Sequence, residues 1–238
     1  MKSSTLVIVQ ARMGSTRFPG KALAQLGDKL LIDHVIQRAL YAAHAENIIV
    51  ATTNLGEDDS LVQHIQSRYK LGIFRGSAFD VRSRFISITE ELKPNFIIRL
   101  TADDPFKDPQ LIRDVIEVLE SGNFDYVSNF ANPCLPIGLD VEGFTAKALK
   151  DSVRQFSDEL NREHVTIGLR ESGLYRTISL NYPQMYPDFR LTIDTVQDLT
   201  NLTKVYYKLR KENGIELLDY TSTCGAISAS IESGEELD

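Results

Sequence analysis

Features that mark several classes of protein are missing from this chain. Its 238 residues include no tryptophan and only two cysteines, Cys134 and Cys224, which are far apart and lack metal-binding spacing. The apolar run Leu6–Val9 is too short for the core of a signal peptide. No run approaches the roughly 20 apolar residues that a membrane-spanning helix needs. We therefore expect a reduced, cytoplasmic protein with no membrane segment.

A surplus of positive charge is missing as well. The chain has 26 Lys and Arg against 33 Asp and Glu, giving a formal net charge of −7. Proteins that bind nucleic acid broadly usually carry a basic face, so we do not expect nucleic acid as a partner. No serine–histidine–acid or cysteine–histidine arrangement stands out, which argues against a covalent intermediate. The hydrophobic content of 42% is enough for one large core.

Strand-like and helix-like patterns alternate four times in the first half of the chain. We expect strands at 6–10, 48–52, 72–74 and 96–100, and helices at 31–40, 58–65, 81–92 and 109–119. This alternation predicts an α/β fold of three layers, with a mainly parallel Rossmann-like sheet covered on both faces. In such sheets ligands bind beyond the carboxyl ends of the strands.

The second half of the chain has a looser pattern. Residues 124–189 are expected to form a small β-rich excursion from the sheet, and residues 190–211 to return to it. The expected strands are 126–128, 139–142, 175–180 and 190–194, and the expected helices are 145–154, 158–171 and 199–209. We predict one domain over residues 1–220 and a loosely held tail at 221–238, which is rich in Ser, Gly and Glu.

The loop after the first strand, Gln10–Lys21, concentrates positive charge in an acidic chain. Arg12, Arg17 and Lys21 can neutralise several negative charges, and Gly14 lets backbone N–H groups approach an oxyanion closely. A polyphosphate fits such a loop. A solvated basic surface loop is the alternative that the loop alone leaves open.

Carboxylates follow two of the later strands. Asp103 and Asp194 come directly after strands that would be neighbours in the sheet, where they could hold one Mg²⁺ shared with substrate phosphates. Helix capping is the alternative role for such residues, and it is the one we favour for Asp104 and Asp108.

Further polar groups stand at strand ends or in the second half. Thr52 follows the second strand and could contact a nucleotide base, although any strand end could supply such a group. The turn Arg75-Gly76-Ser77 follows the third strand and, with Arg82 and Arg84 nearby, is a second candidate site for an anion. The alternative is that Arg82 and Arg84 are ordinary charges on an exposed helix face.

Asp140 and Glu142 would share one face of a strand, as residues two apart do, and could bind a polar substrate or a cation. Surface alternation would also explain them. Arg162 and His164 lie in an expected helix, where His164 is either a base, a carboxylate ligand or a packing histidine.

The order of these stretches resembles the nucleotide-sugar cytidylyltransferases. More closely it resembles the branch named for spore coat polysaccharide biosynthesis protein F, whose relatives make CMP-activated Kdo and sialic acid. The resemblance covers roughly residues 5–211. Its most specific part is the pattern Ala-Arg-x-Gly-Ser-x-Arg-x-Pro-x-Lys, present at Ala11, Arg12, Gly14, Ser15, Arg17, Pro19 and Lys21. Further matches are Arg75-Gly76-Ser77, Thr101 with Asp103 and Pro105, Pro136 to Glu142, Arg162-Glu163-His164, and Leu191-Thr192-x-Asp194-Thr195.

The resemblance implies a nucleotide-diphospho-sugar transferase type of fold and transfer of CMP from CTP to a sugar acid, with pyrophosphate release, for surface polysaccharide synthesis. It implies a homodimer and Mg²⁺ held by Asp103 and Asp194. The implied nucleotide-binding residues are Ala11, Arg12, Gly14, Ser15, Arg17, Lys21, Thr52, Arg75, Gly76 and Ser77, of which Arg12 and Lys21 would be catalytic together with Asp103. The implied acceptor-binding residues are Asp140, Glu142, Arg162 and His164.

The chain departs from the family pattern at three places. Asp104 stands where the family often has cysteine, which adds a carboxylate beside the expected metal ligand. Val196-Gln197 replaces a Pro-Glu pair after Asp194, which removes a helix-starting proline and leaves the ligand. Ile137 replaces an aspartate in a region expected to select the sugar, so the resemblance does not identify the acceptor.

Two other functions remain open from the sequence. A metal-dependent glycosyltransferase of similar fold would also place aspartates after a strand, although it has less need for three cations in the first loop. A catalytically silent nucleotide-binding or assembly subunit is the other alternative.

Overall fold

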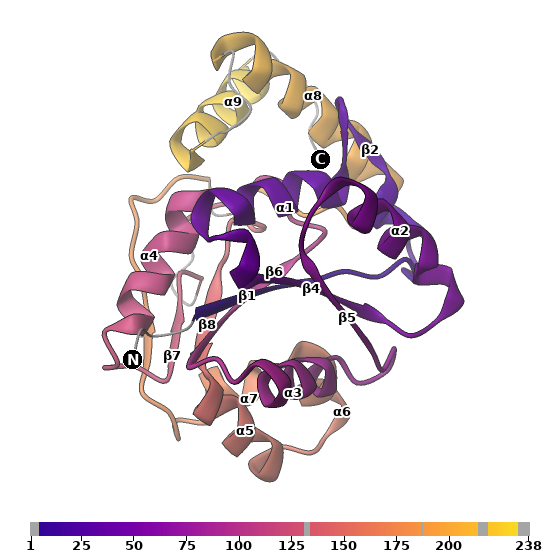
Figure 1. Cartoon of the computed structure of the whole chain (residues 1–238). Helices are drawn as coiled ribbons and strands as arrows, with labels where there is room; N and C mark the ends of the chain where they lie inside the picture. Colours follow the sequence, from indigo (N-terminus) through magenta and orange to yellow (C-terminus); the bar gives the residue numbers. More distant parts are fainter. Residues whose placement is uncertain (1–4, 131–133, 187, 214–218, 233–238) are drawn as a thin grey trace.

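A seven-stranded sheet forms the middle layer of the protein (Figure 1). The computed structural model describes residues 5–130, 134–186, 188–213 and 219–232. The strand order is β5-β4-β1-β6-β8-β7-β9, and a two-stranded hairpin of β2 and β3 lies apart from it. The strands are β1 (Thr5–Gln10), β2 (Gln25–Leu26), β3 (Lys29–Leu30), β4 (Ile48–Thr53), β5 (Gly72–Gly76), β6 (Phe96–Thr101), β7 (Tyr126–Ser128), β8 (Glu142–Thr145) and β9 (Thr177–Ser179).

Helices cover both faces of this sheet. Figure 1 shows α1, α4, α8 and α9 on one side and α3, α5, α6 and α7 on the other. The α-helices are α1 (Leu31–Ala42), α2 (Asp59–Arg68), α3 (Val81–Leu92), α4 (Pro109–Glu120), α5 (Ala146–Gln155), α6 (Glu159–His164), α7 (Ile167–Glu171), α8 (Val196–Asn213) and α9 (Tyr220–Glu232). Short 3₁₀ helices lie at η1 (Lys21–Leu23), η2 (Ala45–Asn47) and η3 (Gly56–Asp58).

The alternation of side chains along β1 builds two separate cores. Val7 and Val9 pack into the larger core with α1, α4 and α8, whereas Leu6 and Ile8 pack into the smaller core with α3 and α5. All four side chains are buried, as expected for a central strand covered on both faces. The expected three-layer α/β fold is therefore confirmed.

The four strands predicted in the first half are all present and parallel. β1 pairs with β4 and β6, and β4 pairs with β5. Gln10 and Thr101, the last residues of β1 and β6, are partners in the register. The loops that follow these two strands therefore begin side by side.

The second half of the chain does not leave the sheet as expected. β8 and β7 extend it in antiparallel fashion beyond β6, and β9 adds a parallel edge. The strand expected at 139–142 begins only at Glu142. The backbone before Glu142 bonds to a side chain instead of to a neighbouring strand. The Asn129 side-chain amide donates to Leu139 O and accepts from Val141 N.

Residues 190–194 were expected to form a strand, and this was wrong. They make one isolated β-bridge to the segment around Ile137, which lies outside the sheet. Leu191 N donates to Ile137 O at 2.7 Å. Gly138 permits this close packing, because its φ is +103° and an added Cβ would lie 3.0 Å from the backbone of Leu191 and Thr192.

The single helix expected over 158–171 is two helices. Val165 separates α6 from α7 with φ +62° and ψ −50°, a conformation that costs energy for a β-branched residue. Thr166 N donates to His164 O at 2.6 Å across it, forming a γ-turn of the rare, strained kind. The helical periodicity of the sequence continues across this break and does not reveal it.

The expectation of a loosely held tail differs from the structure up to Glu232. Residues 220–232 form α9, whose Ala226 and Ile227 are buried in the larger core. Its first residue is fixed by Asp108, whose carboxylate accepts from Tyr220 N at 2.9 Å. Residues 233–238 of the predicted tail lie outside the described residues. None of the helices in the described ranges combines the length and the apolar character needed to cross a membrane.

Candidate active site

A cavity of about 500 Å³ opens at the carboxyl ends of β1 and β6, where a parallel sheet is expected to bind ligands. Four parts of the chain contribute its walls: the loop after β1, the loop after β6, the segment before β8 with the end of α6, and the segment before α8. The lining residues are Gln10, Ala11, Arg12, Ser15, Thr16, Arg17, Lys21, Ala22, Arg99, Thr101, Ala102, Asp103, Asp104, Ile137, Asp140, Glu163, His164, Arg190, Thr192 and Asp194.

The loop after β1 is fixed at Met13. Its carbonyl accepts from Ser15 N at 2.9 Å and from Gly20 N at 2.8 Å, and its own N–H donates to Asp58 Oδ1 at 2.6 Å. Gly20 has φ +78°, the left-handed conformation that glycine adopts without strain. These contacts fold residues 13–20 back on themselves and direct Lys21 into the cavity.

Asp58 stands directly before α2, and its side chain makes no capping hydrogen bond to that helix. Its other oxygen accepts from the hydroxyls of Thr52 and Thr53 and from Thr53 N. Burial raises the pKa of Asp58, but the bonds from Thr53, Met13 and Thr52 outweigh it and hold the pKa below its ordinary value. An ionised Asp58 thus ties the end of β4 to the loop after β1.

Lys21 joins the two aspartates that the sequence predicted as metal ligands. Its Nζ donates to Asp103 Oδ2 at 2.8 Å, to Asp194 Oδ1 at 3.0 Å and to Ile193 O at 3.0 Å. The lysine side chain is 14% exposed, so these three acceptors hold it firmly at the cavity wall. Three residues more than 80 positions apart therefore meet at one point.

Asp194 is the most heavily paired acid of the cavity. Arg17 and Arg190 approach its second oxygen at 2.9 and 2.6 Å, in addition to the contact with Lys21. Burial raises the pKa of Asp194, but these cations outweigh it and lower the pKa below its ordinary value. The bond from Ile193 N to Asp103 O, at 2.9 Å, places this segment beside the loop after β6.

The donor set of Asp103 and Asp194 fits a hard cation. Both carboxylates reach the same nitrogen, so their oxygens face one position, and Mg²⁺ commonly takes one or two carboxylates and shares substrate phosphates. Within the described residues no group of three or more His, Cys, Asp or Glu side chains is arranged as a metal site. Any ion held by these two carboxylates would need further oxygen ligands, such as water or substrate phosphates.

Asp104 has a different setting from its neighbour. Its Oδ2 accepts from Thr101 Oγ1 at 2.7 Å and from Lys107 Nζ at 3.0 Å. Capping was the favoured role for both Asp104 and Asp108; Asp108 has it, accepting from Gln110 N at the start of α4, and Asp104 does not. Burial raises the pKa of Asp104, and the nearby Lys107 opposes this.

Glu142 was predicted to bind substrate beside Asp140, and it is not among the lining residues. It is 4% exposed and accepts from Arg99 Nη1, from Tyr126 Oη and from Thr166 Oγ1, each at 2.6 Å. Arg99 in turn lines the cavity. Glu142 therefore acts on the cavity through Arg99, while Asp140 does line it.

The end of α6 brings Glu163 and His164 to the cavity wall. The γ-turn at Val165 follows directly, and the hydroxyl of Thr166 binds Glu142 on its far side. The strained turn thus connects a buried carboxylate to two wall residues. Arg162, which the sequence grouped with His164, is exposed and is not among the lining residues.

Four predicted nucleotide-binding residues at the ends of β4 and β5 also lie outside the set that lines the cavity. Thr52 donates to Asp58. Arg75 binds Thr53 O at 2.9 Å, Leu55 O at 2.7 Å and Asp59 Oδ1 at 2.7 Å, which accounts for its guanidinium. Gly76 belongs to β5, and Ser77 Oγ accepts from Asp80 N. Gly14 likewise lies in the loop without lining the cavity, and an added Cβ there would meet Glu57. Their binding roles stay predictions.

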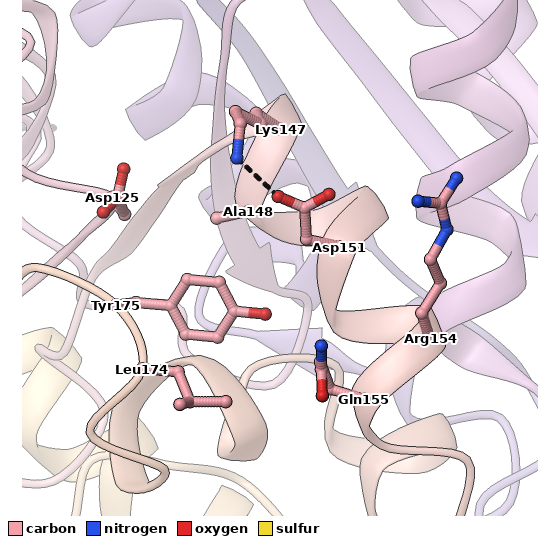
Figure 2. Close-up of a pocket in the computed structure, with 8 residues that line it drawn as sticks. All are labelled: Asp125, Lys147, Ala148, Asp151, Arg154, Gln155, Leu174 and Tyr175. Carbon is pink, nitrogen blue, oxygen red and sulfur yellow. Dashed lines mark hydrogen bonds and ion pairs between the residues drawn. The ribbon is translucent and has the colours of Figure 1, made fainter.

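A second hollow, of about 340 Å³, lies beside α5 and shares no residue with the candidate site (Figure 2). Three of its lining charges are paired within the protein: Lys147 Nζ donates to Asp151 at 2.6 Å, as Figure 2 shows, and Asp125 pairs with Arg176 at 2.9 Å. It therefore offers no linked cluster of cations and carboxylates comparable to the one around Lys21.

Comparison with known proteins decides the family. A family model described as cytidylyltransferase matches residues 6–237. The chain belongs to the cytidylyltransferase family. It is a CTP-dependent nucleotidyltransferase. It is 38% identical to spore coat polysaccharide biosynthesis protein SpsF of Bacillus subtilis over 214 residues, covering 85% of this chain and 86% of that protein. It is also 36% identical to a 3-deoxy-manno-octulosonate cytidylyltransferase of Anaeromyxobacter dehalogenans over 118 residues, covering 49% and 47%.

Solved structures share the fold of this cytidylyltransferase. A cytidylyltransferase from Leptospira borgpetersenii superposes with a TM-score of 0.86 and 24% identity, covering 98% of this chain and 95% of that one. CMP:2-keto-3-deoxy-manno-octonic acid synthetase in complex with CTP superposes with a TM-score of 0.66 and 18% identity, covering 86% and 99%. The resemblance inferred from the motifs is thereby confirmed.

Sequence reasoning about the cytidylyltransferase missed several wall residues. Gln10 and Thr101 end neighbouring strands, and Arg99 interrupts the otherwise apolar strand Phe96–Leu100, so these three gave a readable signal. Arg190 and Thr192 were read as parts of a strand. Lys107, a lysine 2% exposed beneath the wall, gave no signal in the sequence.

Proposed function

We propose that this cytidylyltransferase transfers CMP from CTP to a sugar acid and releases pyrophosphate. The observation that carries the proposal is the meeting of Lys21 with Asp103 and Asp194, at a cavity wall that also presents Arg12 and Arg17. A free nucleoside triphosphate brings about four negative charges, and this wall concentrates positive charge where the rest of the chain is acidic.

The transfer requires alignment and charge neutralisation more than a covalent protein group. An acceptor hydroxyl forms a bond to the α-phosphorus as it loses its proton, while the bond from that phosphorus to the bridging oxygen breaks. Arg12, Arg17 and Lys21 would stabilise the charge that accumulates on the departing pyrophosphate.

Mg²⁺ is part of the proposal because the two aspartates fit it. Asp103 and Asp194 would hold the ion, which would neutralise phosphate charge when bound. Lys21 now lies between these carboxylates, so it keeps them together and prevents two neighbouring negative charges from repelling each other.

The acceptor class is supported by the names of two relatives. One is a spore coat polysaccharide biosynthesis protein, and the other acts on 3-deoxy-manno-octulosonate, a sugar acid. Cavity residues outside the first loop supply polar groups of both charges, Arg99, Asp140 and Glu163, which suit a hydroxylated acidic sugar. We therefore propose that this enzyme serves surface polysaccharide synthesis.

A screen of the four common nucleoside triphosphates against a panel of sugar acids, including Kdo and N-acetylneuraminate, tests the function. Pyrophosphate release is expected with CTP, Mg²⁺ and one or more of the acids. Release of a nucleoside diphosphate from nucleotide-sugar donors, with no pyrophosphate from CTP, would instead support a glycosyltransferase. A silent nucleotide-binding subunit would bind CTP and give neither product.

A homodimer is also part of the proposal, taken from the family resemblance. Most large apolar residues of the irregular region before α8 pack within the chain: Leu135, Tyr182, Met185 and Phe189 lie in or against the larger core, and Phe130 against the smaller. Ile137 and Tyr186 remain exposed. Size-exclusion chromatography with light scattering tests it, since a single 26.7 kDa species would exclude the dimer.

A further inference from the structure

One oxygen of Asp104 is buried at the cavity wall with nothing to bind. The residue is 5% exposed, and it lines the cavity. Among the described residues, its Oδ1 has no hydrogen-bond partner, whereas its Oδ2 has two. An unpaired acceptor removed from water costs roughly 1–3 kcal/mol, so its persistence in a ligand cavity needs a reason.

The orientation of this carboxylate is fixed by contacts behind it. Lys107 is 2% exposed, and its Nζ donates to Asp104 Oδ2 and to the carbonyl oxygens of Gly138 and Asp140. Thr101 Oγ1 holds the same Oδ2 at 2.7 Å. Rotation of the carboxylate would break both of these bonds, so Oδ1 stays directed away from them.

A purely structural role explains only one of the two carboxylate oxygens of Asp104. The negative charge helps to balance the buried Lys107, on which Asp140 and Asp103 also act, and Oδ2 alone makes the direct contact. Asp104 does not cap a helix, since Asp108 starts α4. The second oxygen is left over on a cavity-lining residue, at the side where Lys107 links Asp104 to the carbonyl oxygen of Asp140.

We propose that Asp104 Oδ1 accepts a hydrogen bond from the acceptor, from a hydroxyl or an ammonium group, and thereby selects which sugar acid is used. Lys107 is a positioning residue that holds this oxygen in place. The inference rests on the proposed function, because it assumes that the acceptor occupies this side of the cavity.

Asp104→Asn tests the inference by replacing the unpaired hydrogen-bond acceptor with a donor. The amide oxygen of the variant can keep the contacts with Lys107 and Thr101, which leaves the NH₂ where Oδ1 was. A donor then replaces an acceptor. We expect the KM for the sugar acid to rise about 10- to 100-fold, as loss of a hydrogen bond to a charged group does, and the Kd for CTP with Mg²⁺ to change less than about 2-fold.

A second experiment uses acceptor analogues that each lack one hydroxyl or amino group. The wild type should bind one of them about 10- to 100-fold more weakly than the parent, and Asp104→Asn should weaken that analogue little further, because the contact is already lost. Analogues that lack an amino group and those that lack a hydroxyl distinguish the two donor classes. This experiment includes measurements on the wild type, so it does not depend on the variant folding.

Asp151→Asn is the matched control, because Asp151 lies on α5 beside the second hollow. An unchanged acceptor KM in Asp104→Asn would overturn the inference. A raised Mg²⁺ requirement or CTP Kd with the acceptor KM unchanged would overturn it too, and would make Asp104 a metal or nucleotide ligand.

Failure of the proposed function can be told apart from failure of the inference. If the wild type releases no pyrophosphate from any nucleotide, the function is wrong. Ligand-observed NMR of the same sugar acids with the wild type and Asp104→Asn, in the presence of CTP, then tests the contact without turnover. Equal binding to both proteins, or no binding to either, would overturn the inference.

Discussion

The two walls of the cavity are built in different ways. The wall that we propose binds the nucleotide, called the nucleotide wall, is local: Arg12, Arg17 and Lys21 lie within ten residues of one another on the loop after β1. The wall that we propose binds the acceptor, called the acceptor wall, is assembled from distant segments, in which Arg99 depends on Glu142 and the Asp104 carboxylate depends on Lys107. One wall is a short cationic loop, and the other is held by buried ion pairs.

This difference predicts how each wall responds to substitution. Changes in the proposed nucleotide loop would remove charge that acts on the ligand, so they should affect turnover, with little effect on folding at Arg17, which is 64% exposed, and a modest one at Lys21, which also loses its pairs with Asp103 and Asp194. Changes behind the acceptor wall remove buried partners, so they should affect stability and acceptor use together. Five substitutions test this contrast.

The largest effect is expected from Lys21→Ala. Removal of one well-placed group that stabilises developing charge costs on the order of 10²–10³ in rate, and we expect a loss of that size in kcat/KM for CTP. Asp103→Asn should fall in the same range. Circular dichroism should show the fold unchanged, and Lys147→Ala, at an 85% exposed lysine on α5, serves as the control. Near-normal pyrophosphate release by both variants would show that this wall does not bind the nucleotide.

Glu142→Gln should show the behaviour of the acceptor wall. The substitution takes the charge from a group that binds Arg99, Tyr126 and Thr166, with a cost of about 2–3 kcal/mol. For a chain of this length that corresponds to a fall in Tm of roughly 4–12 °C. The acceptor KM should rise about 10-fold, because Arg99 loses its anchor, while CTP binding changes little. A variant with normal Tm and a raised CTP Kd would reverse the assignment of the two walls.

Asp58→Asn tests the anchor of the nucleotide loop through pH. The folded pKa of Asp58 lies below its ordinary value of 3.8, so its contribution to stability is full above that pH and is lost as pH falls through the folded pKa. The wild type should therefore lose stability below about pH 4 more steeply than the variant. At neutral pH the variant should be about 1 kcal/mol less stable and bind CTP a few-fold more weakly. Urea unfolding at pH 3 and pH 7 measures both slopes, and parallel slopes would contradict the prediction.

The smallest effect is expected from Arg75→Ala. The guanidinium binds Thr53 O, Leu55 O and Asp59, so it supports the end of β4 and is not presented to the cavity. We expect a stability loss of about 1 kcal/mol and a change in CTP KM below about 2-fold. A large increase in CTP KM with unchanged stability would restore the nucleotide-binding role that the motif suggested.

The sequence predicted the parallel half of the fold because its signals are local. Leu6–Val9 and Ile48–Ala51 are apolar runs of strand length, and helices with regular apolar spacing follow them. The second half was harder, since its backbone groups are satisfied by distant side chains. The amide of Asn129 delays the start of β8, and the γ-turn at Val165 divides a continuous helical pattern.

The candidate site was predictable to a similar extent. Lys21, Asp103 and Asp194 could be grouped because each follows a strand or a strand-like run. The role of Glu142 could not be foreseen, because a position two residues from Asp140 suggests a shared face only if the strand begins early enough, and β8 does not. Lys107 has no sequence pattern that separates it from a surface lysine, and its burial follows from the packing of the 138–140 segment.

The central claim is that CMP moves from CTP to a sugar acid in this cavity. CTP radiolabelled at its α-phosphorus, incubated with Mg²⁺ and the sugar-acid panel, tests it most directly. The account predicts that the label appears in a new sugar-linked product, that the released pyrophosphate carries none, and that Lys21→Ala forms this product at least about 100-fold more slowly. Label that stays in CTP, or that appears in CDP, would contradict the account.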